Sequence, residues 1–357
     1  MLHVVIMAGG SGTRFWPVSR QLRPKQLVAL AADRPILRLT FERIAPLVPA
    51  DRIWVVTTRD TADATRDLLP ELPKDNVLAE PEGRDTAACA GFAAQVLLRH
   101  DADAVCAMLP SDHIIGEQDR FRAALRAAAE VVSSDGGLLT FGVQPTRAET
   151  GYGYLKLGDQ HRIVDGWRVH DLARFVEKPD VATAQCYLQD GSYLWNSGMF
   201  VWRAEEFLHE VRRQLPKLAD GLDRVAGALE RADSEAALAE IYPTLARTSV
   251  DYGVMEGAER CWTIPVDFSW SDVGAWPALA DLLPLDSEGN ATRGRVVALG
   301  ADRNLVISEG PVVALAGVQD LVIVATGDAV LVLPADDAQR VKDIVAELEE
   351  RGWDDVL

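Results

Sequence analysis

A glycine-rich segment near the N-terminus has the composition of a phosphate-binding loop. Residues 8–17 read Ala-Gly-Gly-Ser-Gly-Thr-Arg-Phe-Trp-Pro. Glycines allow a backbone to approach a polyphosphate and to direct several N–H groups at it, and Arg14 can pair with phosphate oxygens. Lys25 follows closely and could return a second cation to the same place. The spacing fits neither a Walker P-loop nor a dinucleotide fingerprint, so those two nucleotide folds are disfavoured.

Polar residues elsewhere suggest a metal and a sugar. Asp112 follows an apolar run, where a lone aspartate is often only a helix cap, but a magnesium ion needs few carboxylates when phosphate oxygens and waters complete its shell. Glu177 and Lys178 precede a proline, and as an isolated pair they would be read as a surface ion pair. The Asn196 side-chain amide can both donate and accept, which suits a pair of neighbouring hydroxyl groups.

Alternating apolar segments indicate the elements that must position these residues. Strands are predicted at 2–7, 53–57, 76–79, 104–109 and 138–142, and helices at 35–47, 61–69, 86–99 and 121–133. This alternation predicts an α/β fold, a Rossmann-like and mostly parallel sheet with helices on both faces. Ligands of such sheets bind beyond the carboxyl ends of the strands. Polar or glycine residues that could bind a ligand follow Met7, Ala79 and Leu109, where three of the predicted strands end. Their common position at the strand ends is the first indication of a binding site.

The pattern changes towards the C-terminus. Short apolar runs, punctuated by glycine, asparagine and aspartate, lie at 296–299, 305–307, 312–315, 321–324 and 329–333. They predict a small β-solenoid-like domain, with a final helix over 337–351. We therefore expect a catalytic domain over 1–288 and a β-rich, left-handed β-helix-like domain over 289–357.

Composition limits the partners. The chain of 357 residues is 48% hydrophobic and carries a net charge of -18. This balance argues against a nucleic-acid partner and against an anionic membrane surface. The 4 cysteines are scattered, so buried thiols are expected in place of disulfides or zinc. Neither a signal peptide nor an apolar run of about 20 residues is recognised, so we expect a cytoplasmic protein.

Several motifs together resemble the nucleotide-diphospho-sugar pyrophosphorylases, and their mannose-1-phosphate guanylyltransferase branch in particular. The glycine segment continues as Trp16-Pro17-Val18-Ser19-Arg20, followed by Pro24-Lys25-Gln26. Further matches, in order and covering nearly the whole chain, lie at 80–87, 109–113, 150–154, 175–179, 195–200, 249–256 and 270–274. No single motif is specific, whereas the joint match is.

The resemblance implies a role for each matching residue. Arg14 and Lys25 would be catalytic, and Asp112 and Asp272 would bind Mg²⁺. The sugar phosphate would contact Gly151, Glu177, Lys178 and Asn196. The nucleotide would contact Ala8, Gly9, Gly10, Gly12, Thr13, Gly83, Asp85, Thr86, Leu109 and Ser111. Asp85 departs from the family, which usually has asparagine there, so its role stays open.

The implied reaction joins GTP and mannose 1-phosphate into GDP-mannose and diphosphate, by in-line attack of the sugar phosphate on the α-phosphorus. The attacking phosphate is already anionic, so positioning and charge neutralisation would supply most of the rate. A homo-oligomer, with a dimer favoured, is also implied. A family form with an added isomerase domain exists, and we expect no isomerase activity here.

Three alternatives remain. Another sugar 1-phosphate, such as a heptose, or another base would keep the class. An inactive nucleotide-sugar sensor would not need the charged set Lys25, Asp112, Lys178 and Asp272. A glycosyltransferase typically places a D-x-D motif after a strand, whereas here Asp101-Ala102-Asp103 precedes one.

Overall fold

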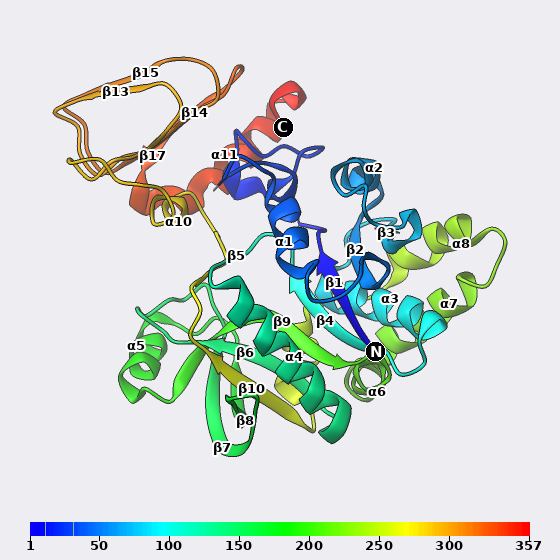
Figure 1. Ribbon diagram of the computed structural model, residues 1–357. Coiled ribbons are helices and arrows are strands. Elements are labelled where there is room, and N and C mark those ends of the chain that lie inside the picture. The colour runs from blue at the N-terminus through cyan, green and yellow to red at the C-terminus, as the bar shows by residue number, and fades with distance from the viewer. Residues whose placement is uncertain (11, 31) are drawn as a thin grey trace. The chain divides into compact units, whose positions relative to one another are not determined.

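The computed structural model describes residues 1–10, 12–30 and 32–357, so Ser11 of the glycine segment lies outside the described residues. The chain divides into two compact units. The sheet unit comprises Met1–Gly9, Phe41–Pro110 and Ile115–Trp270, and the solenoid unit comprises Gly10–Thr40, Ser111–Ile114 and Ser271–Leu357. Figure 1 labels their elements. In the described part of the chain, no helix has both the length and the apolar character needed to cross a membrane.

The sheet unit is built on a nine-stranded sheet, counted over the described residues, in the order β3-β2-β1-β4-β9-β6-β10-β8-β7. The strands are β1 (Leu2–Met7), β2 (Ile53–Thr58), β3 (Val77–Glu80), β4 (Val105–Pro110), β6 (Leu138–Val143), β7 (Tyr154–Val164), β8 (Trp167–Val176), β9 (Tyr193–Arg203) and β10 (Cys261–Val266). β3, β2, β1 and β4 are mutually parallel, as are β6 and β10. β9 and β8 run antiparallel to their neighbours.

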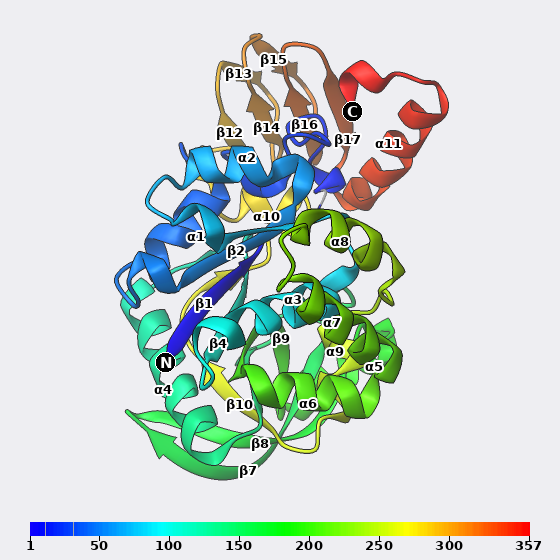
Figure 2. The ribbon, with the colours of Figure 1, turned by 90° about the vertical axis from the view of Figure 1, so that its right-hand side faces the viewer.

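Helices cover this sheet because their apolar sides match its buried strands. They are α2 (Arg59–Leu68), α3 (Asp85–His100), α4 (Gln118–Asp135), α5 (Val181–Asp190), α6 (Ala204–Gln214), α7 (Pro216–Ala228), α8 (Ser234–Ile241) and α9 (Val250–Gly253). The alanine-rich α3 packs with α6 and α7 in one large apolar cluster, in which Trp54 and Trp202 are buried. Figure 2 shows α4 on one side of the sheet and α3, α6 and α7 on the other.

The solenoid unit contains stacked short strands. β12 (Ala291–Arg293), β14 (Leu305–Ser308) and β16 (Leu321–Ala325) are parallel, and β17 (Val330–Pro334) pairs antiparallel with β16. β13 (Val296–Leu299) and β15 (Val313–Ala316) form a second parallel sheet, and α11 (Val341–Glu350) follows. The remaining elements are α1 (Ile36–Ile44), α10 (Pro277–Ala280), β5 (Ile114–Ile115) and β11 (Trp270–Ser271).

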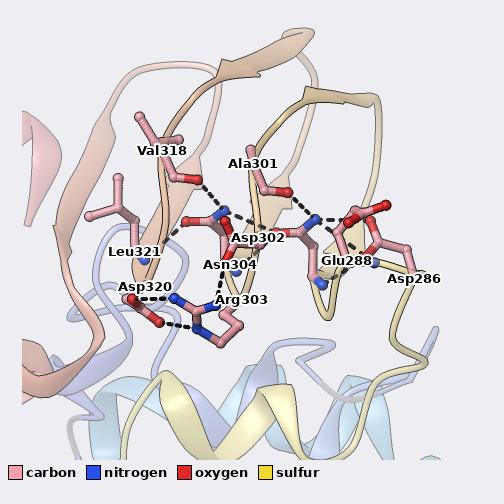
Figure 3. Close-up of polar contacts among 10 residues, drawn as sticks. Asp286, Glu288, Ala301, Asp302, Arg303, Asn304, Val318, Asp320 and Leu321 are labelled. Carbon is pink, nitrogen blue, oxygen red and sulfur yellow. Dashed lines mark hydrogen bonds and ion pairs between the residues drawn. The ribbon is translucent and has the colours of Figure 1, made fainter.

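Two buried asparagines join successive turns of the solenoid (Figure 3). Asn290 Nδ2 donates to the Ala301 carbonyl at 2.8 Å, and Asn304 Nδ2 donates to the Val318 carbonyl at 3.2 Å. Asn290 Oδ1 accepts from Asn304 N at 3.0 Å, and Asn304 Oδ1 accepts from Leu321 N at 3.0 Å. Each amide therefore satisfies backbone groups that a turn would otherwise bury without partners.

The N-terminal segment of the solenoid unit packs on these strands. Phe15, Trp16, Val28 and Leu30 share one apolar cluster with residues of β12, β14, β16, β17 and α11. Trp16 Nε1 also donates to the Val356 carbonyl at 2.7 Å. The C-terminal residues thus support the backbone that carries the glycine segment and Lys25.

The fold-class prediction is confirmed: a large, mostly parallel sheet with helices is accompanied by a strand-rich C-terminal region and a terminal helix. The strands predicted up to residue 142 correspond to β1, β2, β3, β4 and β6. The sequence patterns did not reveal β7, β8, β9, β10 or β12. The expectation of buried thiols was wrong for Cys186, which is exposed, although all the cysteines are free as expected. The boundary at residue 288 stays a prediction.

Candidate functional site

The strongest functional feature of the solenoid unit is a buried ammonium group. Lys25 Nζ donates to Asp112 Oδ2 at 2.7 Å and to the Asp272 carbonyl oxygen at 2.9 Å. It also lies 5.2 Å from the centre of the Phe15 ring. Lys25 is itself buried, whereas Asp112 is about one-third exposed, at 35%. Residues that are 87 and 247 positions from Lys25 thus place oxygens around one positive charge.

Gly12 brings the glycine segment against Lys25. Gly12 has a left-handed backbone, with φ of 64°, which favours glycine. A Cβ atom at this position would lie 2.4 Å from Lys25 Cβ and 2.7 Å from Lys25 N. Ser19 Oγ donates to the Gly12 carbonyl at 2.6 Å and holds the turn from the other side. Gly12 is therefore required by a close backbone approach, which the sequence pattern alone did not specify.

The neighbouring Lys25 ammonium group keeps Asp112 ionised. Burial by itself would raise the pKa of the Asp112 carboxyl group, but the Lys25 ammonium group and His113 outweigh it and hold that pKa below its ordinary value. Asp112 is therefore a carboxylate at neutral pH. Since its oxygen and the Asp272 carbonyl already converge on one cation, these groups fit the partial oxygen shell that Mg²⁺ takes from a protein. In the described residues, no group of three or more His, Cys, Asp and Glu side chains could hold a metal ion.

Arg14 offers a second positive group in the same unit. It lies in a short 3-10 turn formed by Thr13–Phe15, which begins after Gly12. Among the described residues, no hydrogen-bond acceptor contacts its buried Nε atom. A buried donor without a partner costs roughly 1–3 kcal/mol, so an anionic oxygen placed there would be stabilised. Thr13 is half-buried and Gly10 is exposed.

In the sheet unit, Ala8 and Gly9 continue β1. Ala8 N donates to the Val56 carbonyl at 2.7 Å, and the Ala8 carbonyl accepts from Thr57 Oγ1 at 3.0 Å. A Cβ atom on Gly9 would lie 3.2 Å from Glu80 Oε2. The Tyr242 hydroxyl donates to Glu80 Oε1 at 2.5 Å. Burial raises the pKa of Glu80 to about 7, against the lowering effect of that hydrogen bond. Glu80 begins the family-like motif at 80–87 and follows the strand predicted at 76–79, but the sequence assigned it no role in the site.

The other predicted nucleotide contacts have mixed surroundings. Gly83 and Asp85 are exposed, and Asp85 has a left-handed backbone with φ of 65°, a conformation that aspartate and asparagine tolerate. The Thr86 hydroxyl accepts from Val250 N at 2.9 Å, which joins the start of α3 to α9. Leu109 is buried within β4, where it lies opposite Ile6 of β1. In the solenoid unit, Ser111 is buried and its carbonyl accepts from Thr40 Oγ1.

The predicted sugar-phosphate residues gather in the sheet unit. Glu177 Oε1 accepts from Lys178 Nζ at 2.7 Å, and the lysine side chain is 58% exposed. The second oxygen, Glu177 Oε2, is buried and has no hydrogen-bond partner within the described residues. A Cβ atom on Gly153 would lie 2.4 Å from it, so the glycine backbone comes close to this carboxylate oxygen. A buried carboxylate oxygen without a donor is the kind of atom that a ligand hydroxyl group would satisfy.

Asn196 is more fully engaged than its sequence motif suggested. Its Oδ1 accepts from Thr140 Oγ1 at 3.1 Å and from Gly198 N at 3.2 Å. Its Nδ2 donates to Asp251 Oδ1 at 2.7 Å. Asp251 is thereby part of the site, although sequence reasoning quoted it only within a motif and gave it no role.

Aromatic rings border this group. Tyr152 lies edge-on to Trp195 and to Trp270, with ring centres 5.2 and 5.3 Å apart. Gly151 is exposed, and its N–H donates to Glu149 Oε1 at 3.0 Å. Trp195 belongs to the core, as its 5% exposure shows.

A buried ammonium group, a buried arginine donor and nearby carboxylates are groups that would suit a phosphorylated substrate. The comparison with known proteins narrows the class. The chain belongs to the nucleotidyl transferase family, whose model matches residues 3–288. A second model, the MannoseP isomerase/GMP-like beta-helix domain, matches residues 294–348.

Individual relatives are similar along nearly the whole chain. The xanthan biosynthesis protein XanB of Xanthomonas campestris pv. campestris (strain B100) is 38% identical over 98% of this chain and 73% of its own length. The mannose-1-phosphate guanylyltransferase of Escherichia coli (strain K12) is 37% identical over 98% of this chain and 74% of its own. A crystal structure described as the mannose-1-phosphate geranyltransferase of Thermus thermophilus has a TM-score of 0.88 and 36% identity, covering 98% of this chain and 99% of that one.

Proposed function

We infer that this chain is a mannose-1-phosphate guanylyltransferase, which makes GDP-mannose and diphosphate from GTP and mannose 1-phosphate. Its membership of the nucleotidyl transferase family and its full-length similarity to proteins of that name support this function. The observation that carries the mechanism is the convergence of Asp112 and the Asp272 carbonyl on Lys25.

The reaction exchanges one phosphate bond for another. A phosphate oxygen of mannose 1-phosphate attacks the α-phosphorus of GTP and forms the new P–O bond. The bond from the α-phosphorus to the bridging oxygen breaks, and diphosphate leaves with its electron pair. No proton must be removed from the attacking phosphate, which is anionic at neutral pH, so the protein needs cations in place of a general base.

We assign the charge-neutralising roles to residues of the solenoid unit. Arg14 binds the triphosphate through its buried Nε, which has no partner among the described residues, and Lys25 stabilises the charge that develops on diphosphate. Asp112 and Asp272 hold Mg²⁺, which when bound polarises the phosphate oxygens as a Lewis acid. The backbone N–H groups of Gly10, Gly12 and Thr13 act as further donors.

Residues of the sheet unit take the remaining contacts in this proposal. Lys178, exposed and held by Glu177, pairs with the sugar phosphate. Glu177 accepts from sugar hydroxyl groups, and the Asn196 amide and the Gly151 backbone border the ring. Ala8, Gly9, Gly83, Asp85, Thr86 and Leu109 remain the proposed nucleotide contacts.

Release of diphosphate is the direct test. It should be measured with mannose 1-phosphate and each of GTP, ATP, UTP and CTP, with and without Mg²⁺. We expect release with GTP and Mg²⁺ alone. Diphosphate release with another nucleotide would reject the guanylyl assignment. No release with any of the four would favour another sugar 1-phosphate as the substrate, or an inactive nucleotide-sugar sensor.

Association and location complete the proposal. Exposed Val297 and Leu299 of β13, with exposed Ala314 and Ala316 of β15, give the solenoid unit an apolar outer surface that supports a homodimer. Light scattering after size exclusion would measure the mass directly, and a monomer at micromolar concentration would overturn this part. We also propose a cytoplasmic location, where both substrates occur.

A further inference from the structure

A carboxyl group without an assigned role lies beside the proposed sugar contacts. Asp251 is half-buried in the first turn of α9. Two hydrogen bonds fix the start of this turn, since Ser249 Oγ accepts from Tyr252 N and Thr86 Oγ1 accepts from Val250 N. The position of the Asp251 side chain is therefore set by the fold.

The hydrogen bonds of Asn196 show what Asp251 contributes. Asn196 Oδ1 accepts from Gly198 N and lies 3.1 Å from Thr140 Oγ1, whose single proton is shared with the Met199 carbonyl. One N–H of Asn196 Nδ2 donates to Asp251 Oδ1, and among the described residues no second acceptor takes its other N–H. The Asn196 oxygen is thus largely engaged within the fold while its amide N–H can donate to a ligand, so a neighbouring carboxylate is the stronger acceptor for a hydroxyl pair.

A second carboxylate lies close by. The Glu177 side chain is 8% exposed, and its Oε2 has no hydrogen-bond partner within the described part of the chain. The Gly153 backbone approaches both Glu177 Oε2 and Asn196 Cβ, because a Cβ atom there would lie 2.4 and 3.3 Å from them. Burial, followed by the charge of Glu177, raises the pKa of Asp251 to about 6, against the Asn196 hydrogen bond and Lys178, which lower it. The two acids therefore act on one another.

We propose that Asp251 determines sugar specificity by accepting a hydrogen bond from a ring hydroxyl of the hexose 1-phosphate, with Asn196 donating beside it and Glu177 accepting from a neighbouring hydroxyl. A carboxylate next to an amide N–H matches a hydroxyl group that donates and accepts at once. This inference rests on the proposed function, and it adds a residue that reads the sugar.

The first experiment compares the wild-type enzyme with Asp251→Asn, which keeps the size of the side chain and removes the charged acceptor. We expect KM for mannose 1-phosphate to rise by about tenfold or more, as loss of a hydrogen bond to a charged group implies, with KM for GTP changed by less than about twofold. Glu256→Gln, an exposed acid near α9, is the control and should leave both constants unchanged. Equal losses for both substrates, or no loss for the sugar, would overturn the proposal.

A second measurement does not depend on the folding of a variant. The wild-type enzyme should be assayed with the 2-, 3-, 4- and 6-deoxy analogues of mannose 1-phosphate. We expect kcat/KM of the wild-type enzyme to be about tenfold lower with at least one analogue than with mannose 1-phosphate. With that analogue, Asp251→Asn and the wild-type enzyme should have nearly the same kcat/KM, because the hydroxyl group that Asp251 contacts is absent. Uniform use of all four would contradict the proposal. If the wild-type enzyme shows no activity with mannose 1-phosphate itself, the proposed function is rejected instead.

Discussion

Lys25 Nζ lies 2.7 Å from Asp112 Oδ2 and 2.9 Å from the backbone carbonyl of Asp272. Lys25, a proposed catalytic residue, therefore contacts both residues that we assign to Mg²⁺. One ammonium group thus marks the position to which the oxygens of Asp112 and Asp272 already point. A divalent ion binding there would compete with Lys25 for Asp112, which would release the lysine towards the phosphates.

Removing the Lys25 charge should affect catalysis more than folding. In Lys25→Met the apolar stem is kept, and Asp112, about one-third exposed, can regain water. We expect kcat/KM to fall by about 10²–10³, the range seen when a group that stabilises developing charge is lost. Arg23→Met, an exposed neighbour, is the matched control. A variant with turnover within about threefold of wild type would remove Lys25 from the site.

Asp112→Asn should weaken metal binding, and Asp272→Asn, which keeps the backbone carbonyl that contacts Lys25, tests the proposed metal contact of the Asp272 carboxylate. An amide oxygen carries no charge, so the Mg²⁺ concentration for half-maximal diphosphate release should rise by about tenfold or more. Binding of Mn²⁺ in the presence of GTP, followed by electron paramagnetic resonance, gives a readout independent of turnover. Asp343→Asn on the exposed side of α11 should leave both measurements unchanged. Unaltered Mn²⁺ affinity in both site variants would show that the metal lies elsewhere.

The close approach of Gly12 to Lys25 predicts a large difference between two glycines of one segment. Gly12→Ala adds a left-handed alanine and a contact of 2.4 Å with Lys25 Cβ, so the free energy of unfolding should drop by about 2–4 kcal/mol. A Cβ atom on Gly10 meets no atom within 4 Å among the described residues. Gly10→Ala should therefore change stability by less than about 1 kcal/mol. Denaturant melts of both variants measure this difference. Equal free energies of unfolding would contradict the close contact between Gly12 and Lys25.

Glu80 should make the protein less stable as the pH rises. Burial raises its pKa from 4.5 to about 7, so between these values the folded chain holds more of this proton than the unfolded chain does. The free energy of unfolding therefore falls with rising pH across that window. In Glu80→Gln the fall between pH 4.5 and pH 8 should shrink by roughly 3 kcal/mol.

The matched control for Glu80 is Glu130→Gln, an exposed acid on α4 that should leave the pH dependence unchanged. Urea melts at several pH values provide the measurement. Asp251, with its pKa raised to about 6, contributes a similar fall in both variants and does not affect the difference. A Glu80→Gln curve parallel to that of the wild type would mean that the carboxyl group is ionised in the fold at little cost.

Much of the architecture could be predicted because its signals are local. The continuous apolar run of residues 2–7 and the glycines that follow identify β1 and its loop, and regularly spaced short runs identify the solenoid strands. β9 was missed as a strand, and its antiparallel place between β4 and β6 was not foreseen. Strand pairing depends on which segments meet in space, and the sequence of residues 193–203 alone does not indicate which strands lie beside them.

The site divides in the same way. The sequence by itself determined the residue types: a glycine segment with Arg14, the acid Asp112, and the Glu177–Lys178 pair. Only the tertiary structure decided that Asp112 and the Asp272 carbonyl share Lys25, and that Asn196 is bound by Asp251. A residue's chemistry is carried in its side chain, whereas hydrogen bonds and ion pairs depend on distances of about 3 Å, which the packing of segments far apart in the chain must set.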